Sequence, residues 1–203
     1  MQSRIDRQLR ALALAKDCAA LGARVRTIHH LTGLNPRDLL HLLFPDRQAV
    51  PRGRPPDSPE WYHGANLLYR TEASIVMSIY RRLRVAAFSG SESLTGAYRH
   101  YRNICQPPHR ISFDRAFDLA SHTDGLWLTQ AQSFSIVVCP ACHSEYLAAC
   151  GSTAKSNDEC PFCKLVQRYG ADQRVQASFP VQPLAIPASA QLGMLTLLRS
   201  RGG

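Results

Sequence analysis

The apolar residues near the start of the chain recur at the spacing of an amphipathic helix. Ile5, Leu9, Leu12, Ala15 and Ala19 fall three or four positions apart, with basic residues among the polar positions between them. Such a stripe must be covered by the protein's own core or by a partner. The pattern therefore predicts a helix over residues 5–21 with one contact face.

The next segment, residues 23–44, predicts two short helices joined by a tight turn. Gly33 can supply the turn, Asn35 is a typical N-cap, and Pro36 suits the first position of the second helix. Its apolar residues fall where a helix-turn-helix buries its core, which leaves Arg37 and His41 on the exposed face of the second helix. His29 occupies a position where such motifs usually carry a small residue, so a plain helical hairpin is the alternative.

A basic, proline-rich stretch over residues 45–59 predicts an extended loop, which either follows a phosphate backbone or is a solvated linker. A long helix should then run from residue 60 to about residue 84, with a core face that includes Ile75 and Ile79. Arginines at its end suit either the helix dipole or a phosphate patch. Further helices are expected at residues 91–103 and 112–121.

After Gly125 the pattern changes to short β-strands, at residues 126–128 and 134–138, and a hairpin through Tyr146 and Leu147. The final segment is rich in Ala, Gln and Pro, which predicts disorder. We therefore expect a mainly α protein. A helical domain over residues 1–122 carries the helix-turn-helix-like segment, a small zinc-ribbon-like β module spans 123–174, and a disordered tail spans 175–203.

Two C-x-x-C pairs, Cys139 with Cys142 and Cys160 with Cys163, carry the strongest chemical signal in the sequence. Their separation matches the template in which four thiolates hold one zinc ion per chain. Four protein ligands leave no open position, so this metal should be structural. Two disulfides, a redox pair, unrelated buried thiols and an iron site with the same ligands are the alternatives.

The charge balance places the basic excess in the first 110 residues. The chain has a formal net charge of +9, and residues 111–203 hold seven basic residues against seven acidic ones. Nucleic-acid backbones attract such surfaces. The candidate DNA contacts are basic residues of the two short helices, the loop and the end of the long helix: Arg24, Arg26, Arg37, His41, Arg52, Arg54, Arg81, Arg82 and Arg84.

The chain lacks an apolar run long enough to span a membrane and lacks the apolar block of a signal peptide at its N-terminus. We therefore expect a cytoplasmic protein without membrane association. In that compartment, seven cysteines argue against a disulfide scaffold.

Three features together resemble the FlhC family of flagellar transcriptional activators. They are the segment from Leu21 to Leu34, the helix that starts at Ser58-Pro-Glu-Trp61 with Ala97-Tyr-Arg-His-Tyr101 after it, and the late pair of C-x-x-C elements. The resemblance covers residues 5–170. Carried over to this sequence, it implies that Cys139, Cys142, Cys160 and Cys163 hold zinc.

The resemblance also implies function. Family members join dimers of FlhD in a heterohexamer, bind promoter DNA upstream of class 2 flagellar operons and act with RNA polymerase; they are not enzymes. A zinc-dependent hydrolase would need an open metal site, which four cysteines do not leave. A zinc-stabilised adaptor that contacts proteins but not DNA is the alternative function.

Overall fold

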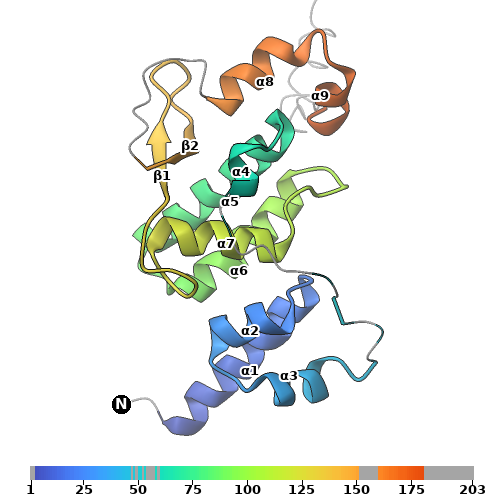
Figure 1. The fold of residues 1–203 in the computed structure, drawn as a ribbon, viewed down its shortest axis with the longest axis vertical. Coiled ribbons are helices and arrows are strands. Elements are labelled where there is room, and N and C mark those ends of the chain that lie inside the picture. Colours follow the sequence, from blue (N-terminus) through green and yellow to red (C-terminus); the bar gives the residue numbers. More distant parts are fainter. Residues whose placement is uncertain are drawn as a thin grey trace, which may run out of the picture.

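The computed structural model describes residues 3–46, 48, 50, 51, 53, 58, 60–150 and 160–180. Helices dominate, and the elements form three tiers along the long axis of the molecule (Figure 1). Helices α1 to α3 form one end, α5 to α7 lie in the middle, and a β-hairpin with α8 and α9 forms the other end. The predicted mainly α class is confirmed.

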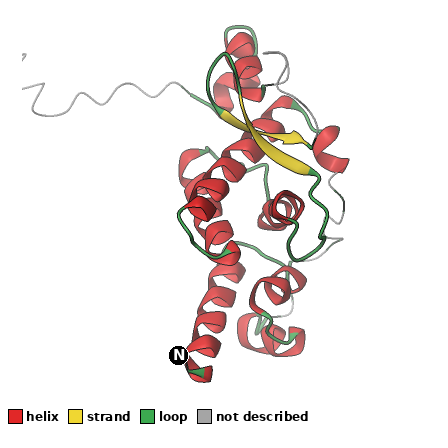
Figure 2. Ribbon diagram, turned by 90° about the vertical axis from the view of Figure 1, so that its left-hand side faces the viewer, coloured by secondary structure: helices red, strands yellow, loops and turns green. Residues whose placement is uncertain are grey.

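The first tier contains α1 (Arg4–Ala20), α2 (Val25–Thr32) and α3 (Pro36–Leu43). Ser3 and Asp6 form a capping box that starts α1. The stripe of α1 is used in two ways, because Ala15 and Cys18 are fully buried whereas Ile5 and Leu9 are 69% and 60% exposed. Figure 2 shows the N-terminal half of α1 projecting past the neighbouring helices.

The two short helices and their turn form as predicted. Gly33 takes the left-handed conformation at φ 71°, which ends α2, and Asn35 caps α3 by accepting a hydrogen bond from the backbone N–H of Arg37. His29, which stands where a small residue was expected, bonds across the turn through Nδ1 to the carbonyl of Leu34 at 2.7 Å. Leu42, expected in the core, is 62% exposed.

The middle tier consists of α4 (Glu60–His63), α5 (Leu67–Val85), α6 (Gly90–Ile104) and α7 (Phe113–Asp124). The predicted single helix from residue 60 is interrupted, because Asn66 caps a new helix through the N–H of Tyr69. Helix α5 packs against α6, α7, the hairpin and α8. It therefore buries a wide face that includes Val76, Met77 and Tyr80, while Ile75 and Ile79, the expected core positions, are only half-buried.

The third tier begins with β1 (Phe134–Val138) and β2 (Glu145–Ala149), which pair antiparallel with Ile136 opposite Leu147. The strand predicted at residues 126–128 is wrong, because this segment is a turn in which Trp127 has φ 59°. The hairpin does not stand apart from the helices. Tyr62 donates its hydroxyl to the carbonyl of Leu147 at 2.7 Å, and the N–H of Leu147 donates to Ser74 on α5.

Two helices complete the third tier, α8 (Pro161–Tyr169) and α9 (Gln173–Ser178). The predicted β-hairpin is present in the cysteine module, and a helix, α8, follows Cys160. Helix α9 crosses the predicted start of the tail at residue 175, and Val175 is buried. The remainder of the predicted tail, residues 181–203, lies outside the described residues.

Candidate metal centre and helix-turn-helix unit

The four paired cysteines converge on one point in the third tier. Their sulfur atoms all lie within 4.8 Å of one another. Cys139 and Cys163 are 3.7 Å apart at Sγ, and Cys142 and Cys160 are also 3.7 Å apart. The structure therefore brings together residues that are separated by up to 24 positions in the sequence.

The first pair sits on the turn of the β-hairpin. The N–H of Cys139 donates to the carbonyl of Ser144, and the N–H of His143 donates back to the carbonyl of Cys139. His143 takes the left-handed conformation at φ 57°, where glycine is the easiest residue. Histidine visits this region more often than most side chains. The turn thus keeps its geometry although glycine is absent.

The second pair sits at the start of α8. Cys160 is the N-cap of this helix, Pro161 follows at its first position, and Cys163 lies in its first turn. Backbone N–H groups and the helix dipole favour negative charge there, which stabilises thiolates. Pro161 suits the first position of a helix, and the run after Cys163 contains good helix formers such as Lys164 and Leu165.

Protons are shared unequally among the thiols. Burial by itself would raise the pKa of the Cys142 thiol. Hydrogen bonds with Ser144 and with the neighbouring thiols outweigh this effect, so the pKa falls to about 6. Hydrogen bonding with Cys142, together with some desolvation, raises the pKa of Cys163 to about 12. Burial also raises the pKa of Cys160. A metal ion that binds here displaces the protons that remain.

The geometry of the cluster fits a tetrahedral metal ion. Four sulfurs about 2.3 Å from a central zinc ion are about 3.8 Å apart, close to the two distances of 3.7 Å. A disulfide would need sulfurs about 2.05 Å apart, so the cluster is not a pair of disulfides. Zinc and iron both accept four thiolates, and the donor set alone does not choose between them.

The candidate DNA contacts of the first tier differ in their surroundings. Arg26, Arg37 and His41 are exposed on α2 and α3. Arg24 is instead held by Asp114 of α7, through an ion pair of 3.2 Å and a bond of 3.1 Å from its backbone N–H. The guanidinium of Arg24 therefore helps to hold the first tier against the middle tier. Arg52 and Arg54 lie outside the described residues.

The three arginines at the end of α5 are paired with carboxylates. Arg81 and Arg82 lie 3.4 Å and 3.6 Å from Glu145 of β2, and Arg84 lies 3.0 Å from Asp124 of α7. These contacts tie α5 to the hairpin and to α7. The three arginines come from the middle tier, whereas Arg26, Arg37 and His41 come from the first, so the candidate contacts do not form one cluster.

Sequence reasoning missed two buried carboxylates. Asp114 accepts from the hydroxyl of Thr27 at 2.6 Å in addition to holding Arg24. Glu72, 1% exposed, pairs with Arg110 at 2.5 Å and accepts from the hydroxyl of Tyr101. No local motif marks either residue, because their partners are 29 or more positions away.

Taken together, the fold defines a mainly helical protein that carries a four-cysteine candidate metal site at one end and a helix-turn-helix pair at the other. The family of flagellar transcriptional activators named FlhC matches residues 2–176. The chain belongs to this family. No curated protein matches the sequence. None of the described helices is both long enough and apolar enough to cross a membrane.

Proposed function

We propose that this flagellar transcriptional activator binds promoter DNA of class 2 flagellar operons directly, in complex with FlhD. Helix α3 carries the proposal: its N-terminus is capped by Asn35, and it presents Arg37 and His41 to solvent. Arg26 of α2 is exposed as well. A second helix held in this way can enter a major groove, where arginine pairs with guanine.

Zinc has a structural role in this proposal. All four clustered cysteines would serve as ligands, so the ion would have no open position for water or substrate. When bound, it would hold the hairpin turn and the start of α8 together. RNA polymerase, the remaining partner that the family implies, would be met by the assembled complex on the promoter.

One observation favours the second candidate function, an adaptor without direct DNA contact. The exposed face of α3 also carries Leu40 and Leu42, which are 40% and 62% exposed. Apolar side chains at such positions are typical of protein contacts. If α3 binds a protein rather than DNA, Arg37 should contribute nothing to the preference of the protein for promoter DNA over random DNA.

The experiment is a binding titration with the Arg37→Ala protein in complex with FlhD. Because a bidentate contact to guanine contributes about 1 to 3 kcal/mol, we expect that loss on the promoter and almost none on random duplex. Arg168→Ala is the matched control, since Arg168 is exposed on α8 in the third tier. Equal losses on both duplexes would make Arg37 a phosphate contact, and no loss on either would favour the adaptor.

A further inference from the structure

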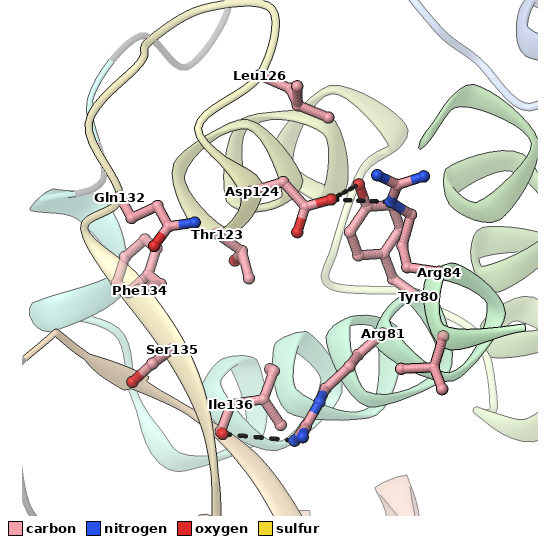
Figure 3. Close-up of a pocket in the computed structure, with 11 residues that line it drawn as sticks. Tyr80, Arg81, Arg84, Thr123, Asp124, Leu126, Gln132, Phe134, Ser135 and Ile136 are labelled. Carbon is pink, nitrogen blue, oxygen red and sulfur yellow. Dashed lines mark hydrogen bonds and ion pairs between the residues drawn. The ribbon is translucent and has the colours of Figure 1, made fainter. Parts of the chain in front are cut away.

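A cleft between α5, α7 and β1 has no role in the proposal above. Its volume is about 440 Å³. Figure 3 shows Arg81 and Arg84 of α5 facing Phe134 and Ile136 of β1 across it, with Asp124 at the end of α7. The outer edge of β1 forms one wall of this cleft.

The hydrogen-bond pattern of the hairpin shows which backbone groups face the cleft. Cys139 donates its N–H to Ser144, and Cys150 donates to Ser133, so these positions are the hydrogen-bonded pairs of the ladder. Pairing alternates along an antiparallel strand. The N–H and C=O of Phe134, Ile136 and Val138 therefore point away from β2, toward the outer edge.

Within the part of the chain that the structure describes, no strand pairs with this edge; Phe134 at the start of β1 is buried, and the accessible part of the edge is the half toward Val138. The sheet there has two strands, and the outward groups of β1 meet one side chain, where Arg81 donates through Nη1 to the carbonyl of Ile136 at 3.5 Å. A bond of that length is weak. An incoming strand can replace it. Unprotected strand edges are the sites at which a further chain pairs most readily.

The side chains that line the cleft indicate which kind of peptide could bind there. Val85 on its rim is 79% exposed, and Val138 beyond it on β1 is 51% exposed, so apolar side chains of an added strand would have neighbours to cover. The three arginines at the end of α5 face two carboxylates, Asp124 and Glu145, which leaves one positive charge in excess. An acidic residue complements that excess.

We propose that the outer edge of β1 binds an extended acidic peptide segment of a partner protein, which adds as a third strand of the sheet. Backbone hydrogen bonds to Ile136 and Val138 supply the contact, Val85 covers an apolar side chain, and the arginines receive a carboxylate. DNA fits this surface less well, because one wall of the cleft is apolar.

The probe is a phage-displayed library of random ten-residue peptides, selected on the zinc-loaded full chain carrying a solubility tag. Enriched peptides should combine alternating β-branched residues with Asp or Glu. In hydrogen exchange, the best synthetic peptide should protect the amides of Ile136 and Val138. No enriched pattern, or protection elsewhere on the chain, would overturn the proposal.

Variants separate the edge from other sites. Val85→Glu places a like charge on the rim and should weaken the selected peptide at least tenfold, whereas Val166→Glu, at a 72% exposed valine of α8, should not. Ile136→Pro removes one outward N–H without touching the ladder to β2 and should also weaken it tenfold, with Ile136→Val as control.

Thermal unfolding and metal content identify a misfolded variant. If Ile136→Pro fails to fold, the affinity of the Val85→Glu protein alone tests the proposal. Parental affinity in the Val85→Glu protein would reject the site. Displacement of the peptide by random duplex DNA, with matching loss of DNA binding in that variant, would instead assign the surface to nucleic acid and overturn the proposal.

Discussion

At the scale of single residues, Asp114 joins the helix-turn-helix pair to the rest of the protein. Its side chain is almost fully buried and accepts hydrogen bonds from the N–H of Arg24 and the hydroxyl of Thr27, beside its ion pair with the Arg24 guanidinium. Removing it would leave these donors without an acceptor inside the protein. Arg24 therefore contributes to the orientation of α2 rather than to an exposed charge.

We expect Asp114→Ala to lower the free energy of unfolding by about 3 kcal/mol, because a buried charge and its donors lose their partner. Urea unfolding followed by circular dichroism measures the change. Asp38→Ala, at an exposed carboxylate of α3, should change it by less than about 0.5 kcal/mol. Equal effects of the two substitutions would contradict the role assigned to Asp114.

The remaining cysteines allow a test of the metal site. Burial raises the pKa of Cys18 to about 11 and that of Cys105 to about 12, so both stay protonated and unreactive near pH 7.5. Cys150 is exposed. In the purified protein, iodoacetamide should modify Cys150 and spare the four ligands of the metal.

A chelator that removes the metal should also open the module, which frees its thiols from the contacts that raise their pKa values. The same reagent should then add four further labels, at Cys139, Cys142, Cys160 and Cys163. Mass spectrometry of the labelled peptides, read at short times, counts them. Disulfides would stay unlabelled until a reductant was added. Labelling of the four cysteines before chelation would therefore argue against a bound metal.

At the scale of elements, the metal module combines a hairpin turn with a helix N-terminus. Neither element has a large core of its own: the buried cluster around the cysteines includes Tyr146 and Ala148 and few other apolar side chains among the described residues. A metal ion bound by the four cysteines would supply much of the stability that packing supplies elsewhere. Its loss should affect the whole module.

Cys160→Ser should abolish metal binding and lower the melting temperature by at least about 5 °C, which corresponds to roughly 2 kcal/mol in a chain of this size. Elemental analysis and calorimetry measure the two effects. Cys150→Ser provides the control, since Cys150 is exposed and stands outside the cluster. Unchanged metal content in Cys160→Ser would refute the site, and iron in place of zinc would correct the identity of the ion.

Much of the fold could be predicted from the sequence, because many elements carry local signals. Capping and turn residues such as Gly33 and Asn35 mark α2 and α3, and the spacing of the cysteines marks their cluster. The sequence predicted the wrong buried face for α5. Four elements surround this helix, so apolar residues occur on several of its faces and their spacing does not single out one buried face. The partners of Asp114 lie 90 and 87 positions away, so no local pattern records them.

At the scale of the whole molecule, the two ends offer different surfaces. The first tier exposes basic residues and the apolar stripe at the start of α1, while the third tier holds the metal cluster. Because Ala15 and Cys18 of the same stripe are buried in the core, the exposed part extends an existing helix-packing face. That continuity favours a partner helix as its cover, in line with the proposed complex with FlhD.

Replacing Leu9 and Leu12 by aspartate should weaken association with FlhD at least tenfold, because charges on the stripe oppose its burial. Analytical ultracentrifugation of mixtures measures association, and circular dichroism checks that α1 stays helical. Arg7→Asp on the opposite face of the same helix is the control. If the doubly substituted, folded protein still joins FlhD with parental affinity, another surface makes the contact.

The buried carboxylate of Asp114 also has a consequence for synthesis on the ribosome. The hydrogen bond from the backbone N–H of Arg24 cannot form until its acceptor, which lies 90 residues further along the chain, has been synthesised. At about 5 to 20 residues per second, this delay lasts roughly 5 to 18 s. During this interval α2 and α3 can form locally but are not yet anchored to α7. The first helices to leave the ribosome are therefore available to chaperones or to a partner before the nascent chain can fix their orientation.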